Sequence, residues 1–113
     1  MKRGEIWLIS LDPAIGAEIK KTRPAIIVND DELGKLPLKV IVPVTDWKEK
    51  FAMAPWMVKI IPDKRNNLDK ISSVDCFQIR SISEQRFVKK IGFIDNDIMI
   101  RIEIALTKVL NIF

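Results

Sequence analysis

Histidine is absent from this sequence of 113 residues, and Cys76 is its only cysteine. Without histidine, the chain cannot form the Ser–His or Cys–His pairs of nucleophilic catalysis, and most catalytic zinc sites are excluded as well. A single cysteine can form no disulfide within the chain and no cysteine-based zinc site. Any chemistry must therefore use Arg, Lys, Glu, Asp, Ser or Thr side chains, and we expect neither a metal ion nor a cofactor.

Long apolar runs are also missing. The longest, residues 24–28 and 40–44, are far shorter than the ~20 residues that a membrane span requires. Residues 1–12 alternate between polar and apolar side chains and include Glu5 and Asp12, a pattern unlike that of a signal peptide. We therefore expect a cytoplasmic protein without membrane attachment.

The composition suits one small globular domain. Hydrophobic residues make up 48% of the sequence and charged residues 30%, which is enough for a single core with a charged surface. We expect one domain that spans residues 1–113. The net charge of +4 and the isoelectric point near 9.3 favour a polyanionic partner such as nucleic acid.

Short strands separated by turns are predicted for most of the chain. Aliphatic and aromatic residues gather in segments that end at Asp, Asn or Pro, as is typical of strands bounded by turns. The expected strands are residues 5–11, 24–28, 38–45 and 56–61, with two more within 71–82. Strands at such close spacing indicate a barrel or a sandwich. Lys89 and Lys90 are predicted to lie in a solvated turn.

A helix is expected at the C-terminal end of the chain. After Asp95, which can serve as the N-cap, apolar residues recur with helical spacing as far as Leu110. Three further apolar residues, Ile100, Ile104 and Ile112, widen the apolar stripe beyond what one sheet face needs. Either a second buried contact covers them, or the helix packs in a deep groove; the sequence leaves both open.

Several short motifs follow one another in a characteristic order. They are Arg3–Gly4–Glu5–Ile6–Trp7, Asp12–Pro13, Gly16–x–Glu18, Arg23–Pro24–Ala25, Pro43–Val44–Thr45 and Gln78–Ile79–Arg80–Ser81–Ile82. In this order they resemble the MazF/PemK toxins of type II toxin–antitoxin systems, the Kid toxin among them, from Arg3 to about Arg86. The resemblance implies a mainly β fold with a C-terminal α-helix, namely a small SH3-like β-barrel of the MazF/CcdB kind, paired into a homodimer.

The resemblance also implies an activity and a partner. The activity is sequence-specific cleavage of single-stranded RNA without a metal ion, in which the 2′-OH of the RNA attacks the adjacent phosphate. The products would carry 2′,3′-cyclic phosphate and 5′-OH ends, and DNA, which lacks the 2′-OH, would not be cleaved. A cognate MazE-like antitoxin would neutralise the toxin by laying an acidic tail across the basic loops. Because the nucleophile belongs to the substrate, this chemistry needs no histidine.

Arg23, Thr45 and Glu18 are the catalytic residues that the resemblance implies. Arg23 precedes a proline at the junction of a loop and a strand, and its planar guanidinium matches the oxygens of a phosphate. Since arginine stays protonated, it suits charge stabilisation better than proton abstraction. Thr45 would donate a hydrogen bond to the scissile phosphate. Glu18 would either hold Arg23 in place or act as a base.

RNA binding is expected from two basic loops and from the last motif. The expected RNA-binding residues are Lys20, Lys21, Lys48, Gln78, Arg80 and Ser81. Gln78 would read a base edge, while Arg80 would either contact phosphate or support the fold. Trp47, Phe51 and Trp56 are candidates for stacking on bases. Of these, Trp56 is rather expected to pack inside the barrel, and an antitoxin contact is the alternative role of Phe51.

The sequence departs from the family pattern at three places. Ala17 stands where the Kid branch has a histidine, and Ile19–Lys20 replaces the usual Gln-Gly. Asp75–Cys76–Phe77 aligns with an Arg-Cys-Asp segment of that branch, so the arginine and aspartate of that segment are missing here. These departures favour chemistry centred on Arg23 and Thr45.

Two other functions remain open at this point. CcdB toxins share the fold but jam gyrase through a C-terminal Trp-Gly-Ile, whereas this chain ends Asn111–Ile112–Phe113. A non-catalytic SH3-like module that binds nucleic acid is the other alternative. The presence of both Arg23 and Thr45 favours the ribonuclease.

Overall fold

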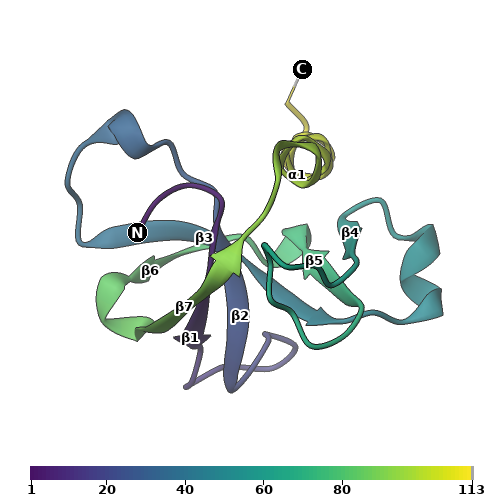
Figure 1. Cartoon of the computed structure of the whole chain (residues 1–113), viewed down its shortest axis with the longest axis horizontal. Helices are drawn as coiled ribbons and strands as arrows, with labels where there is room; N and C mark the ends of the chain where they lie inside the picture. Colours follow the sequence, from purple (N-terminus) through teal and green to yellow (C-terminus); the bar gives the residue numbers. More distant parts are fainter. Residues whose placement is uncertain (113) are drawn as a thin grey trace.

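The computed structural model describes residues 1–112, and there one α-helix packs on a sheet of seven antiparallel strands (Figure 1). Phe113, the last residue of the expected domain, lies outside the described residues. In chain order the elements are β1 (Glu5–Ser10), β2 (Thr22–Ile27), β3 (Leu38–Asp46), β4 (Met57–Ile60), β5 (Ser72–Asp75), β6 (Arg80–Ser83), β7 (Phe87–Phe93) and α1 (Asn96–Leu110). Four short 3-10 helices join them: η1 (Asp31–Leu33), η2 (Glu49–Met53), η3 (Cys76–Gln78) and η4 (Glu84–Arg86). The expected mainly β class with a C-terminal helix is confirmed.

The long strand β3 organises the sheet, whose strand order is β4-β5-β3-β2-β1-β7. One edge of β3 pairs with β2. The other edge is shared, because its first half pairs with β6 and its second half with β5. Within the described residues no ladder joins the outer strands β4 and β7, so the sheet is not closed into a barrel. The division of β3 between two partners sends the β4–β5 hairpin away from the remaining strands (Figure 1).

Strand β7 was not expected from the sequence. Lys89 and Lys90, predicted to lie in a turn, belong to this strand and pair with Leu8 and Trp7 of β1. The turn prediction is therefore wrong. Both lysines are exposed at the sheet edge, where charged side chains are common. Two adjacent charges are therefore compatible with an edge strand, although they suggested a turn in the sequence.

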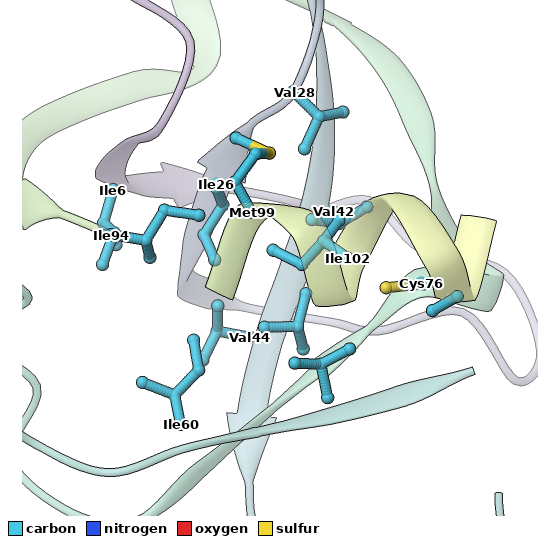
Figure 2. Close-up of a cluster of buried hydrophobic side chains, with 13 residues drawn as sticks. Ile6, Ile26, Val28, Val42, Val44, Ile60, Cys76, Ile94, Met99 and Ile102 are labelled. Carbon is cyan, nitrogen blue, oxygen red and sulfur yellow. The ribbon is translucent and has the colours of Figure 1, made fainter. Parts of the chain in front are cut away.

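Alternating side chains of β2 and β3 build two separate cores. On one face, Ile26, Val42 and Val44 join the larger cluster beneath α1, which contributes Met99 and Ile102 (Figure 2). On the other face, Ala25, Ile27 and Ile41 belong to a smaller cluster with Ile9, Leu11 and Ile82. This division follows from the two-residue period of a strand, which points successive side chains to opposite faces.

The helix α1 begins as the sequence predicts. Asp95 accepts a hydrogen bond from the backbone N–H of Ile98 at 2.9 Å, which satisfies one of the free amides of the first turn. Only one face of α1 is covered, because Ile100 and Ile104 on the outer face are 50% and 52% exposed. The helix therefore does not lie in a deep groove of this chain, and a second contact by another chain stays a prediction. Among residues 1–112 we find no helix with the length and apolar character needed to cross a bilayer.

Candidate active site

Arg23 and Thr45 lie opposite each other on neighbouring strands. Ala25 pairs with Pro43, and continuing this antiparallel register by two residues brings Arg23 of β2 opposite Thr45 of β3. Nη1 of Arg23 donates to Oγ1 of Thr45 over 3.4 Å. Both side chains are half-buried, and both lie on the sheet face opposite α1. The two residues that the family resemblance implied, 22 positions apart, therefore lie next to each other in the structure.

The loop between β1 and β2 supplies a second contact to Arg23. Nε of Arg23 donates a hydrogen bond to the carbonyl of Lys20 at 3.0 Å. Lys21, the next residue, has a φ of 68°, in the left-handed region, and its N–H donates to Oδ1 of Asp12 at 2.9 Å. The guanidinium is thus held at two edges, by a backbone oxygen and by a hydroxyl. Lys20 and Lys21 themselves are exposed and face solvent beside it.

Glu18 closes a turn of the same loop. Its Oε1 accepts a hydrogen bond from the backbone N–H of Ile15 at 2.7 Å. Within the described residues, no hydrogen bond or ion pair links Glu18 to Arg23. Of its two expected roles, the structure therefore provides no contact for holding Arg23, and Glu18 is an exposed carboxylate of this loop.

Gln78 connects this loop to the other side of the site. It lies in η3, between β5 and β6, and its Oε1 accepts from the N–H of Ile19 at 2.8 Å. Its Nε2 donates to Oδ2 of Asp75 at 3.1 Å. Both ends of the amide already have one protein partner, so base reading would have to use its remaining donor and acceptor capacity.

Asp75 is the residue that sequence reasoning missed. Only 7% of Asp75 is exposed. Burial raises the pKa of its carboxyl, and the hydrogen bonds from Gln78 and from the N–H of Phe77 offset this increase only in part. The one available signal was a charged residue at the end of the buried strand Ser72–Asp75. Cys76 is buried beside it; burial, and then the Asp75 charge, raise the pKa of its thiol to about 12, so it is no nucleophile.

A surface groove of about 520 Å³ adjoins the loop. It is lined by Ile15, Ala17, Glu18, Phe77, Gln78, Ile79 and Arg80. Three predicted residues, Glu18, Gln78 and Arg80, therefore meet in one depression. Ser81 follows Arg80 on β6 and is exposed opposite Val40.

Aromatic side chains form two pairs near the β3–β5 end of the sheet. Trp47 and Phe51 meet edge to face with ring centroids 6.0 Å apart, and Nζ of Lys59 lies 4.9 Å from the Trp47 ring. Lys48, between them in sequence, is exposed.

The second pair corrects one expectation. Trp56 is 37% exposed and packs against Phe77, which is 65% exposed, with centroids 5.9 Å apart. The prediction that Trp56 packs inside the barrel is therefore wrong. It lies in the turn just before β4, which is the last strand at one edge of the sheet formed by residues 1–112.

The arrangement of cationic and hydroxyl donors suits a phosphate, and comparison with known proteins identifies the chain. The family model of the PemK-like, MazF-like toxins of type II toxin–antitoxin systems matches residues 2–110. The chain belongs to this family. It is 33% identical over 107 residues to the endoribonuclease MazF of Staphylococcus epidermidis, covering 94% of this chain and 88% of that protein. It is 34% identical over 98 residues to the endoribonuclease MazF9 of Mycobacterium tuberculosis, covering 81% of this chain and 80% of that one.

Solved structures show the fold of this PemK/MazF-family toxin. MazF from Deinococcus radiodurans superposes with a TM-score of 0.81 at 19% identity, covering 98% of this chain and 96% of that one. A mycobacterial endoribonuclease in complex with its cognate antitoxin gives a TM-score of 0.79 at 18% identity, covering 100% of this chain and 97% of that one. The sequence resemblance is therefore confirmed at the level of both family and fold.

In the part of the chain that the structure describes, no cluster of metal ligands accompanies the site. Among residues 1–112, no group of three or more His, Cys, Asp or Glu side chains is placed to hold a metal ion. The polar groups gathered at the candidate site are the guanidinium of Arg23 and the hydroxyl of Thr45, with the exposed Lys20 and Lys21 on the adjoining loop.

Proposed function

We propose that this PemK/MazF-family toxin is a sequence-specific endoribonuclease that cleaves single-stranded RNA without a metal ion. The observation that carries the proposal is the Arg23–Thr45 pair, in which Nη1 and Oγ1 lie 3.4 Å apart on one sheet face. The relatives from Staphylococcus epidermidis and Mycobacterium tuberculosis, both named endoribonucleases, support the activity. The net charge of +4 supports an RNA substrate.

The proposed reaction uses the 2′-OH of the RNA as nucleophile. The 2′-oxygen bonds to the adjacent phosphorus and the bond from phosphorus to the 5′-oxygen breaks, which leaves a 2′,3′-cyclic phosphate and a 5′-OH. We assign Glu18 as the base that takes the proton of the 2′-OH, and the leaving 5′-oxygen takes up a proton from water. Arg23 and Thr45 donate hydrogen bonds to the non-bridging oxygens, where negative charge increases in the transition state.

The basic loops would guide the RNA strand to this centre. Lys20 and Lys21 lie beside Arg23, and Lys48 follows Thr45 after two residues. Cations along a groove attract the phosphate backbone without regard to sequence. Gln78 and Arg80 line the groove of about 520 Å³, which we propose receives a base. Sequence preference is therefore assigned to the groove and affinity to the lysines.

Two protein partners complete the proposal. A solved mycobacterial relative is described as bound to its cognate antitoxin, and we expect a MazE-like antitoxin to cover the same basic loops with an acidic segment. The exposed outer face of α1, with Ile100 and Ile104, is expected to contribute to a homodimer. A strictly monomeric mass at micromolar concentration would contradict the homodimer.

The test is incubation of the purified toxin with a long defined RNA in EDTA, followed by mapping of the 5′ ends and analysis of the 3′ ends. Discrete cuts with 2′,3′-cyclic phosphate are expected. A matched RNA with a single 2′-deoxynucleotide on the 5′ side of a mapped cut should resist cleavage at that site alone. A folded protein that binds the RNA but leaves it intact would overturn the proposal and favour the non-catalytic module.

A further inference from the structure

One peptide group in the β1–β2 loop is held at both of its polar atoms. Its carbonyl, on Lys20, accepts the hydrogen bond from Nε of Arg23 at 3.0 Å. Its N–H, on Lys21, donates to Oδ1 of Asp12 at 2.9 Å. Because a peptide group is planar, fixing the direction of the N–H also fixes the direction of the carbonyl oxygen. The carboxylate of Asp12 thus sets where the acceptor for Arg23 points.

The flanking backbone is tied down on both sides of this peptide. On one side, the carbonyl of Lys21 accepts a hydrogen bond from the N–H of Leu11 at 3.0 Å. Lys21 itself has a φ of 68°, a left-handed conformation that is energetically costly for lysine. On the other side, the N–H of Ile19 donates to Gln78, which donates in turn to the buried carboxylate of Asp75. A left-handed lysine persists only where its surroundings impose it, and these contacts do so.

We propose that Asp12 and Gln78 are positioning residues that orient the guanidinium of Arg23 by holding the Lys20–Lys21 peptide group. The proposal rests on the proposed ribonuclease function for its kinetic consequence, and it gives Gln78 a role additional to base reading. Neither residue needs to touch the reacting atoms. Their effect reaches the phosphate through the direction of Arg23, whose misplacement by an ångström is enough to lose most of the rate.

The first experiment compares Asp12→Ala with Asp12→Asn in cleavage kinetics. Asp12→Ala removes the acceptor, and kcat should fall about 10- to 100-fold while KM stays within about threefold, as for a contact that acts only in the transition state. Asp12→Asn keeps an oxygen that accepts from Lys21, so it should retain most of the activity. Equal loss in both variants, or a change in KM alone, would overturn the proposal.

A matched control removes the same kind of bond elsewhere. Oδ1 of Asp30 accepts from the N–H of Glu32 at 2.9 Å at the start of η1, outside the site. Asp30→Ala should leave both kinetic constants near those of the wild type. A loss of kcat comparable to that of Asp12→Ala would show that the effect is general loosening, and the proposal would fail.

The second experiment reads the position of Arg23 without any RNA. In ¹⁵N NMR spectra, the Nε–H signal of Arg23, assigned by its disappearance in Arg23→Lys, should show slowed exchange with water in the wild type. Asp12→Ala should shift this signal and abolish its protection, and Asp12→Asn should restore both. If Asp12→Ala does not fold, Gln78→Met removes the other anchor and should shift the same signal. An unchanged signal in a folded variant would overturn the proposal.

The two experiments distinguish failure of the ribonuclease function from failure of the positioning role. A wild-type protein that cleaves no RNA would overturn the ribonuclease function, while the NMR signal would still decide whether Asp12 holds Arg23. An active wild type with an Arg23 signal insensitive to both variants would leave the ribonuclease function standing and refute the positioning role.

Discussion

The two faces of β2 and β3 differ although the same strands build both. On the face beneath α1, Ile26 and Val42 are fully buried among aliphatic side chains. On the opposite face the same strands present Ala25 and Ile27 to the smaller core and then, at the strand ends, Arg23 and Thr45. No helix of the described residues covers this second face, so its polar end stays open to a substrate. Both faces therefore carry an apolar core, but only the second face also carries the candidate site, at the ends of its strands.

Arg23→Ala is the variant with the largest expected effect on the open face. Removal of the guanidinium should lower kcat/KM for RNA by at least about 10³-fold, because the transition-state charge loses its principal partner. The unfolding midpoint should stay close to that of the wild type, since Arg23 belongs to neither apolar cluster. Cleavage assays and urea titrations on the same preparation measure both. The control is Arg65→Ala, at an exposed arginine in the segment between β4 and β5, which changes the charge equally and should cleave normally.

Ile102→Ala is the corresponding variant on the face beneath α1. Ile102 is fully buried against the sheet, so its truncation should lower the free energy of unfolding by about 2–5 kcal/mol through lost burial and the cavity that remains. Activity per folded molecule should be unchanged. Ile61→Ala, the same substitution at a residue that is 60% exposed, should cost less than about 0.5 kcal/mol. A selective loss of activity in Ile102→Ala would show that the two faces are coupled.

Thr45→Val removes the hydroxyl of Thr45 but keeps a side chain that suits strand β3. Valine keeps the β-branched shape and suits β3, so the fold should be preserved. Loss of one donor to the phosphate should lower kcat about 10- to 100-fold. Thr45→Ser, which keeps the hydroxyl, should retain more activity than Thr45→Val. If both variants cleave equally well, the hydroxyl has no part in the reaction.

The smallest effect is expected at Glu5, at the start of β1. Although burial alone would raise the pKa of its carboxyl, hydrogen bonds from Trp7, the Lys2 amide and Lys90 outweigh burial and lower the pKa from 4.5 to about 2. A lowered pKa in the folded state stabilises the protein above pH 4.5, and this contribution is lost as the pH falls toward 2.

Glu5→Gln measures this contribution. The variant should lower the free energy of unfolding by about 1 kcal/mol at pH 7, and the difference from the wild type should shrink on acidification. Urea titrations at pH 7 and pH 3 test it. A difference that grows on acidification would contradict the assigned direction of the shift.

Much of the fold was predictable because local patterns agree with the tertiary structure. The strand predicted at residues 38–45 becomes β3 (Leu38–Asp46), and the N-cap predicted at Asp95 is observed. The missed strand β7 carries Lys89 and Lys90 on an exposed sheet edge, where a strand needs no apolar alternation. The burial expected for Trp56 failed because burial depends on the neighbouring strand, and β4 lies at the edge of the sheet.

The candidate site was predictable residue by residue, but its connections were not. Arg23, Thr45 and Gln78 were selected by the order of motifs. The roles of Asp12 and Asp75 emerge only from hydrogen bonds that span the β1–β2 loop and η3. A carboxylate that holds a backbone amide leaves no periodic signal in a sequence, because its partner is defined by the path of the chain and not by a side-chain type.

The sequence by itself determined the strand-rich fold class, the C-terminal helix with its cap, and the absence of histidine and disulfide chemistry. These follow from side-chain period, capping and composition, which are local properties of the chain. Only the tertiary structure decided that β3 serves two partners along one edge, that Arg23 meets Thr45, and that a single peptide group connects Asp12 to the guanidinium. Strand register and loop path arise from contacts between distant segments, so no local pattern specifies them.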